Sequence, residues 1–175
     1  MEIDAQVAAA LGFPKFRYVF IENERRWICP FVPFELVTET EQITDLYVTG
    51  TNLRLREARS LSTGTAMLRL TRKVDADSQT RLISSVYLAE TEFSLLRSVL
   101  VGRTIRKRRH RLRSDASAVL AVDEFQDALS GLVLLEAEFT SAQALTDFPA
   151  PPFAGIEVTD NLRYTGGCLS LNGLP

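Results

Sequence analysis

The sequence predicts a mainly β protein of the α+β class, in which an antiparallel sheet closes into a barrel and a few short helices pack outside it. At least seven segments show the alternating pattern of a strand, whereas the segments with a helical period are short. Five of these strands pair an apolar face with a face that carries ionisable groups. Closing the sheet into a barrel would remove the unpaired edges that an open sheet leaves.

The first strand, at residues 20–27, has two unlike faces. With a two-residue period, Glu22, Glu24 and Arg26 lie on one side. Two carboxylates at this spacing are ~7 Å apart and repel by about 2 kcal/mol at an effective dielectric constant of about 20. A partly enclosed face of this kind therefore needs nearby cations. The alternative interpretation is a surface strand whose acidic pair is solvated.

The remaining elements follow in chain order. Further strands are expected at residues 43–49, 52–58, 67–73, 82–88, 103–113, 118–125 and 132–139, the last two joined as a hairpin through residues 128–131. Short helices are expected at residues 3–11, 90–101 and 141–147, and residues 34–42 are either helical or a loop. We expect residues 1–14 to be a helical appendage and residues 15–175 to form a single domain.

Composition excludes several classes of protein. A hydrophobic content of 46% and a charged content of 24% are typical of a globular domain, and a net charge of −2 gives no overall attraction to nucleic acid or anionic lipid. Cys29 and Cys168 match no metal-ligand spacing and are expected to be reduced thiols. The first ten residues lack the basic start of a secretory signal, and no apolar run approaches the ~20 residues that span a bilayer. A cytoplasmic protein that contacts no membrane is the expectation.

The charged faces of the strands suggest a binding site. If they point into the barrel, its lumen is walled by Arg54, Arg56, Arg69, Lys73, Lys107 and Arg109. Enclosed cations are costly to desolvate unless an anion accompanies them, and guanidinium groups bind phosphate oxygens bidentately. This pattern predicts a tunnel for a polyanion such as a run of phosphates. A one-sided sheet with its charged face in water is the competing interpretation.

At these residues the chain resembles the CYTH domain, the family of triphosphate tunnel metalloenzymes. Glu22-Asn23-Glu24-Arg25-Arg26 is similar to the family signature Glu-x-Glu-x-Lys. The resemblance continues in order and covers about residues 15–172. Its later segments are Tyr47 with Leu53-Arg54-Leu55-Arg56, Leu70-Thr71-Arg72-Lys73, Ile105-Arg106-Lys107-Arg108-Arg109-His110, Val122-Asp123-Glu124-Phe125, Leu135-Glu136-Ala137-Glu138-Phe139 and Glu157-Val158-Thr159-Asp160-Asn161-Leu162-Arg163-Tyr164.

The resemblance implies an eight-stranded antiparallel barrel that forms a tunnel, with Mg²⁺ or Mn²⁺ as cofactor. Family members include inorganic tripolyphosphatases, thiamine triphosphatases, RNA 5′-triphosphatases and a class of adenylate cyclase. By this resemblance, Arg54, Arg56, Lys73, Lys107 and Arg109 would bind phosphate, and Arg163 would bind phosphate or fix the C-terminal segment. Arg26 and Arg69 complete the expected phosphate-binding set. Glu22, Glu24, Glu136 and Glu138 would be metal ligands, with Asp123 nearby.

Three positions depart from the family pattern. Arg26 stands where the signature has lysine, and Gly167 stands where many members have a lysine that faces the tunnel. The family also has a Glu-x-Glu pair on the strand before the helix at residues 90–101. Here residues 78–89 contain no acid, and the nearest, Glu90 and Glu92, are expected to open that helix.

These departures set two hypotheses against each other. In the first, the tunnel binds a phosphorylated ligand, for example a nucleotide or a cyclic mononucleotide such as cAMP, with weak hydrolysis or none. The alternative is a divalent-metal-dependent triphosphatase that acts on inorganic tripolyphosphate or on a nucleoside or thiamine triphosphate; adenylate cyclase activity is a lesser possibility.

A third hypothesis treats residues 103–113, which contain seven arginines and lysines, as an RNA-binding patch. The run offers only His110 for base stacking, so nucleic acid is the less favoured partner. His110 itself is expected to be a surface or wall residue. Exposed apolar outer faces leave the choice between a monomer and a homodimer open.

Overall fold

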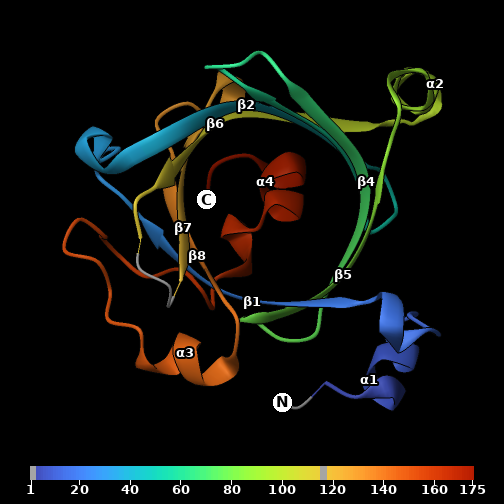
Figure 1. The fold of residues 1–175 in the computed structure, drawn as a ribbon, viewed down its shortest axis with the longest axis horizontal. Coiled ribbons are helices and arrows are strands. Elements are labelled where there is room, and N and C mark those ends of the chain that lie inside the picture. Colours follow the sequence, from blue (N-terminus) through green and yellow to red (C-terminus); the bar gives the residue numbers. More distant parts are fainter. Residues whose placement is uncertain (1–2, 115–117) are drawn as a thin grey trace.

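The structure is a computed structural model that describes residues 3–114 and 118–175. Eight strands form a closed barrel in the order β1-β5-β4-β3-β2-β6-β7-β8, with every pair of neighbours antiparallel (Figure 1). The predicted eight-stranded antiparallel barrel is therefore confirmed. Its strands are β1 (Phe20–Ile28), β2 (Val37–Val48), β3 (Leu53–Ser60), β4 (Ala66–Asp75), β5 (Thr80–Tyr87), β6 (Gly102–Leu112), β7 (Val119–Phe125) and β8 (Val133–Phe139).

Three of the four α-helices lie outside the ring of strands (Figure 1). They are α1 (Ala5–Ala10), α2 (Glu90–Val99) and α3 (Ala142–Asp147), and each falls inside a segment predicted to be helical. Asp4 caps α1, because its carboxylate accepts hydrogen bonds from the backbone N–H groups of Gln6 and Val7 at 2.8 Å. No helix in the described residues is both long and apolar enough to cross a bilayer.

Parts of the outer face of the barrel are covered by apolar contacts. Trp27 of β1 and Leu135 of β8 pack with Leu145 of α3 in the largest cluster of buried apolar side chains. Ala8 and Phe13 pack over Leu82 of β5, which attaches the N-terminal helix to the barrel wall. Because side chains alternate along a strand, burying Trp27 and Leu135 on the outside turns Arg26 and Glu136 inward.

The fourth helix, α4 (Gly166–Asn172), lies within the ring of strands when the barrel is viewed along its axis (Figure 1). Leu169 of α4 packs against Ile105, Phe125 and Leu134, which share the inward faces of their strands with charged residues. The barrel interior is therefore apolar beneath α4 and charged beyond it. The sequence analysis treated this region as a tail, and α4 was missed.

A second difference concerns residues 34–42, which were assigned to a helix or a loop. Only Phe34–Leu36 forms a 3₁₀ turn, and β2 begins at Val37. Residues 37–42 are polar, but their pairing with β6, for example Thr40 opposite His110 and Gln42 opposite Arg108, holds them in the sheet. Cross-strand pairing thus extends β2 beyond the strand predicted at residues 43–49.

Candidate functional site

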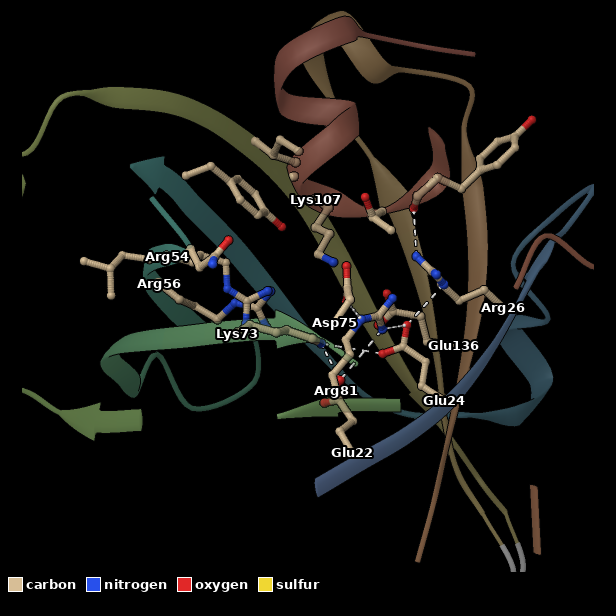
Figure 2. A pocket seen from close by; sticks show the side chains of 18 of the residues that line it. Glu22, Glu24, Arg26, Arg54, Arg56, Lys73, Asp75, Arg81, Lys107 and Glu136 are labelled. Carbon is tan, nitrogen blue, oxygen red and sulfur yellow. Dashed lines mark hydrogen bonds and ion pairs between the residues drawn. The ribbon is translucent and has the colours of Figure 1, made fainter. Parts of the chain in front are cut away.

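A cavity of about 210 Å³ lies inside the barrel, between α4 and a group of charged side chains (Figure 2). Five acidic and eight basic residues line it. They are Glu22, Glu24, Asp75, Glu136 and Glu138, with Arg26, Arg54, Arg56, Arg69, Lys73, Arg81, Lys107 and Arg109. Residues 164–167 and Tyr47 line the side next to α4. The structure thus brings together every predicted site residue except Arg163.

The predicted metal ligands share one side of the cavity, which we call the acidic wall: Glu22 and Glu24 of β1 with Glu136 and Glu138 of β8. The register places Glu24 opposite Glu138 and Arg26 opposite Glu136. Glu22 and Glu24 are both buried. Burial raises the pKa of Glu22, and although Lys73 opposes this, the charges of Glu24 and Glu138 add to the increase.

Two cations inside the cavity neutralise part of the acidic wall. Lys73 of β4 forms an ion pair with Glu22 and lies 3.6 Å from Glu24. Arg81 of β5 contacts Glu24 at 2.5 Å and also donates a hydrogen bond from its Nε to Asp75 at 2.5 Å. Burial would raise the pKa of Glu24, but Lys73 and then Arg81 and Arg26 outweigh it and lower the pKa to about 2.

Sequence reasoning missed Arg81. Residues 78–89 were described by their lack of acids, and the inward direction of their one base, Arg81, was overlooked. The signal was present in the pattern, since Arg81 lies on the same face of its strand as Ile83 and Ser85. Only the register, which pairs Glu22 with Arg81, shows that the two charges meet.

Across the cavity lie Arg54 and Arg56 of β3 (Figure 2). Together with Arg69 of β4, which also lines the cavity, they form what we call the basic wall. Asp45 of β2, fully buried behind it, accepts hydrogen bonds from Nε and Nη2 of Arg56 at 2.6 Å. The same carboxylate lies 3.7 Å from Nε of Arg54. Asp45 was not predicted to take part, because one acid in a strand gives no pattern of its own.

Arg69 has no carboxylate partner among the described residues. Its pKa is lowered to about 10 by burial and by the charges of Arg56 and Arg54. Three guanidinium groups therefore share a single buried carboxylate, and the basic wall carries an excess of positive charge. A bound anion would relieve this repulsion.

A third group of charges is satisfied within the wall of β6, β7 and β8. Arg109 donates to both oxygens of the fully buried Asp123, at 2.8 and 2.7 Å, and also contacts Glu136. Lys107 forms an ion pair with the same Asp123. Asp123, expected near the metal, is thus the counter-ion of two predicted phosphate ligands.

Several other predicted residues lie away from the cavity. Arg163 is exposed and lies beside residues 172–175. Glu92 accepts a hydrogen bond from the backbone N–H of Ala89 at the start of α2, as expected for a capping residue. His110 packs edge-to-face against Phe34 and contacts Thr40.

The basic run of β6 does not present a continuous cationic surface. Arg106 forms a bidentate hydrogen-bonded pair with Asp127, at 2.7 and 2.8 Å, and Arg108 lies 3.9 Å from Glu124. Both arginines are exposed on the outside of the barrel, as the RNA-binding hypothesis required, but each has an acidic partner. These pairings give that hypothesis no support.

The acidic wall was tested for a metal site. Within residues 3–114 and 118–175, no three carboxylate, imidazole or thiol groups converge closely enough to hold a metal ion. Mg²⁺, however, is usually bound by one or two carboxylates together with water and substrate phosphates. Glu138 has no ion pair in the described part of the chain, and it adds to the negative charge around Glu22. Among the described residues, Glu138 is thus the carboxylate of the acidic wall that could hold a divalent cation without giving up an ion pair, and water and a phosphate ligand would have to complete the coordination.

No protein-family model matches the chain. Over 82 residues it is 35% identical to an inorganic triphosphatase of Nitrosomonas europaea, a match that covers 47% of this chain and 54% of that protein. The aligned region thus spans about half the length of this relative.

Solved structures cover more of the chain. The crystal structure of the hypothetical protein NE1496 has a TM-score of 0.60 and 28% identity, covering 88% of this chain and 99% of that one. That of the inorganic triphosphatase NE1496 has a TM-score of 0.59 and 26% identity, covering 88% and 97%. PH1819 of Pyrococcus horikoshii, at 22% identity and a TM-score of 0.53, shares the fold over 69% of this chain and 78% of that one.

The closed barrel with cations and carboxylates facing its lumen is the architecture that the resemblance to the triphosphate tunnel proteins implied. Together with these relatives, it supports the resemblance of the chain to the CYTH family.

Proposed function

We propose that this chain is a divalent-metal-dependent triphosphatase that hydrolyses inorganic tripolyphosphate in the barrel cavity. The observation that carries the proposal is the charge arrangement: an undercompensated basic wall faces an acidic wall across a single cavity. The name of the Nitrosomonas relative supports hydrolysis, and it favours this alternative over binding without turnover.

The basic wall would bind the phosphate chain. Arg54, Arg56 and Arg69 present planar forks to the cavity, and such forks match phosphate oxygens bidentately. Asp45 fixes Arg56 from behind through two hydrogen bonds, so this guanidinium loses little further freedom when a ligand arrives. The positive charge would also stabilise the charge that develops on the leaving phosphate in the transition state.

The acidic wall would hold the metal through Glu22, Glu24, Glu136 and Glu138. A divalent cation bound there would neutralise phosphate oxygens and polarise the phosphoryl group for attack by water. Lys73 and Arg81 already hold Glu22 and Glu24 in place, which keeps the carboxylates directed inward when no ligand is bound.

The size of the cavity favours an inorganic substrate. Its volume of about 210 Å³ is below the ~300 Å³ at which pockets for drug-sized ligands begin. A short phosphate chain would be accommodated, whereas the nucleoside of a nucleotide or the thiamine of thiamine triphosphate would have to lie outside the charged region.

Phosphate release from tripolyphosphate with Mg²⁺ or Mn²⁺ tests the proposal. We expect metal-dependent turnover that falls by about 100-fold in Glu24→Gln, the order of effect seen when one electrostatic group is removed. The matched control is Glu124→Gln, which removes a carboxylate from the outer face of β7.

Binding without hydrolysis also has a structural basis, because Lys73 and Arg81 form ion pairs with Glu22 and Glu24, two carboxylates that a metal would need. If calorimetry detects a tightly bound nucleotide, cyclic nucleotide or polyphosphate but no phosphate is released with either metal, the hydrolase proposal is wrong. The protein would then be a binding module.

A further inference from the structure

Arg26 was expected to bind phosphate, yet its side chain is committed elsewhere. It is 2% exposed, and its Nη1 and Nη2 atoms donate hydrogen bonds to the backbone carbonyls of Tyr164 and Thr159, both at 3.3 Å. Its Nε lies 3.2 Å from Glu24, an ion pair without a hydrogen bond. Figure 2 shows Arg26 reaching along the side of the cavity, with Glu24 and Glu136 beside it.

The backbone of Arg26 contacts the same segment. Its N–H donates to the hydroxyl of Thr159 at 3.0 Å, and its carbonyl accepts from the N–H of Val158 at 2.8 Å. Residues 159–167, which we call the rim segment, lead into α4, and their last four residues line the cavity. The rim segment is therefore attached to β1 at one residue, through both main chain and side chain.

We propose that Arg26 is a positioning residue that couples the rim segment to Glu24, and that it is not a phosphate ligand. The expected effect on tripolyphosphate hydrolysis rests on the proposed function, whereas the attachment of the rim segment by Arg26 does not. Two carbonyls in different turns require two donors that diverge, and the carboxylate of Glu24 beside them requires a positive charge. The guanidinium fork supplies them, whereas the ammonium group of lysine is a single point.

The coupling has a consequence for the cavity. Binding of substrate beside residues 164–167 requires them to be in place, and Arg26 fixes them before the ligand arrives. Without Arg26, part of the binding free energy would be spent on ordering the rim segment. The loss should therefore appear as weaker binding of substrate rather than as a slower chemical step.

The test compares Arg26→Lys with Thr159→Val, which weakens the same attachment without changing the charge. The first readout is amide hydrogen exchange of the ligand-free protein. We expect at least tenfold faster exchange at Val158, Tyr164 and Leu169 in both variants. The amide of Val158 donates to the carbonyl of Arg26, and the amides of Tyr164 and Leu169 donate to carbonyls of the rim segment. The second readout is tripolyphosphate hydrolysis, in which KM should rise about tenfold and kcat change less than threefold.

Arg69→Lys is the matched control, since Arg69 lines the cavity without contacting the rim segment. It should weaken tripolyphosphate binding and leave the exchange of these amides unchanged. Unaltered exchange in Arg26→Lys, combined with weaker tripolyphosphate binding, would overturn the inference and restore Arg26 to the phosphate ligands.

Failure of the two proposals can be told apart. If wild-type protein releases no phosphate but both variants exchange faster, the proposed function is wrong and the attachment of the rim segment is right. If Arg26→Lys does not fold, Thr159→Val alone decides, and normal exchange at Val158 and Tyr164 in that variant would sink the inference.

Discussion

Arg69 differs from the other arginines of the basic wall in lacking an acidic partner among the described residues. Arg56 and Arg54 share Asp45, whereas Arg69 is crowded by both of these cations, and burial together with their charge lowers its pKa. A charge held in this way costs stability in the empty protein and contributes to binding only when an anion is present.

The Arg69→Gln substitution should therefore separate stability from binding. We expect the free energy of unfolding to stay equal or to rise, because repulsion with Arg54 and Arg56 is removed. Tripolyphosphate binding should weaken at least tenfold, a loss of about 1.4 kcal/mol. Urea unfolding and calorimetry measure the two quantities. A variant that is less stable but binds normally would show that Arg69 has a structural role.

Unlike Arg69, Asp45 should stabilise the empty protein, because it is the only carboxylate in the described chain that is hydrogen-bonded to Arg56. The Asp45→Asn substitution leaves buried guanidinium groups uncompensated, and we expect a loss of about 3 kcal/mol in the free energy of unfolding. The control is Asp127→Asn, whose partner Arg106 is exposed, so the free energy of unfolding should change far less than in Asp45→Asn. Similar losses in both variants would contradict the importance of burial.

The pH dependence of stability follows from the same charges. Burial alone would raise the pKa of Asp45, but Arg56 and Arg54 outweigh it and hold the pKa well below its ordinary value of 3.8. The pKa of Glu24 is lowered from 4.5 to about 2. The pKa of Glu22 is raised, so this group affects the pH dependence of stability in the opposite direction.

Glu136 behaves like Asp45 and Glu24. Burial would raise its pKa, but Arg109 and Lys107 outweigh this effect and hold the pKa well below its ordinary value. For Asp45, Glu24 and Glu136, the unfolded chain binds more protons than the folded protein as the pH falls. The stabilisation from these groups is therefore complete above about pH 5 and is lost as the pH falls toward 2.

We therefore expect the urea midpoint to fall between pH 5 and pH 3. The decline should be shallower in Asp45→Asn, which has lost one of the contributing groups. A steeper decline in that variant would mean that another carboxylate dominates.

At the scale of elements, α4 depends on one close approach. A Cβ on Gly166 would overlap the hydroxyl of Tyr47 and lie 2.7 Å from its Cζ, whereas a Cβ on Gly167 would meet nothing within 4 Å. Tyr47 faces Arg54 across the β2–β3 pair, so the position of α4 is linked to the basic wall.

Gly166→Ala and Gly167→Ala form a matched pair within this helix. Overpacking in Gly166→Ala should lower the free energy of unfolding by about 1–2 kcal/mol and weaken tripolyphosphate binding, because α4 or Tyr47 must move. Gly167→Ala should leave stability equal or raise it by up to about 1 kcal/mol, through the higher helix propensity of alanine. Equal effects in urea unfolding would show that the contact with Tyr47 is not limiting.

The elements that could be predicted were those whose own residues alternate strongly. Leu53-Arg54-Leu55-Arg56 gives both the strand and its inward face. By contrast, α4 contains two glycines and only seven residues, and it is stabilised by the packing of Leu169 inside the barrel. The start of β2 is polar and is held by pairing with β6. Such elements depend on tertiary contacts that local patterns do not contain.

At the scale of the whole molecule, closure of the barrel explains which site residues could be predicted. Strand alternation placed Lys73 and Lys107 on charged faces, and the resemblance to the CYTH family assigned those faces, with Glu22 and Glu136, to the lumen. Partners such as Arg81 and Asp45 depend on which strands are neighbours and in which register. Because β5 pairs with β1, Arg81 neutralises carboxylates of a strand far away in the sequence, and the pairing of β2 with β3 brings Asp45 to Arg56.

Closure also predicts how a ligand acts on the protein as a whole. The cavity is lined by residues from all eight strands of the barrel, so a bound polyanion would contact strands around the ring. Because Lys73 and Arg81 already neutralise part of the acidic wall, we expect tripolyphosphate to bind even when EDTA removes divalent cations. At 100 times its dissociation constant it should stabilise the fold by about 2.7 kcal/mol.

The measurement is thermal or urea unfolding with EDTA, and hydrogen exchange should show added protection in β1, β3 and β4 together. Orthophosphate at the same concentration is the control, since it can engage only part of the basic wall and should stabilise less. If tripolyphosphate stabilised the protein only when Mg²⁺ or Mn²⁺ was present, the internal cations would not suffice to neutralise the acidic wall. Anion binding would then depend on the metal from its first step.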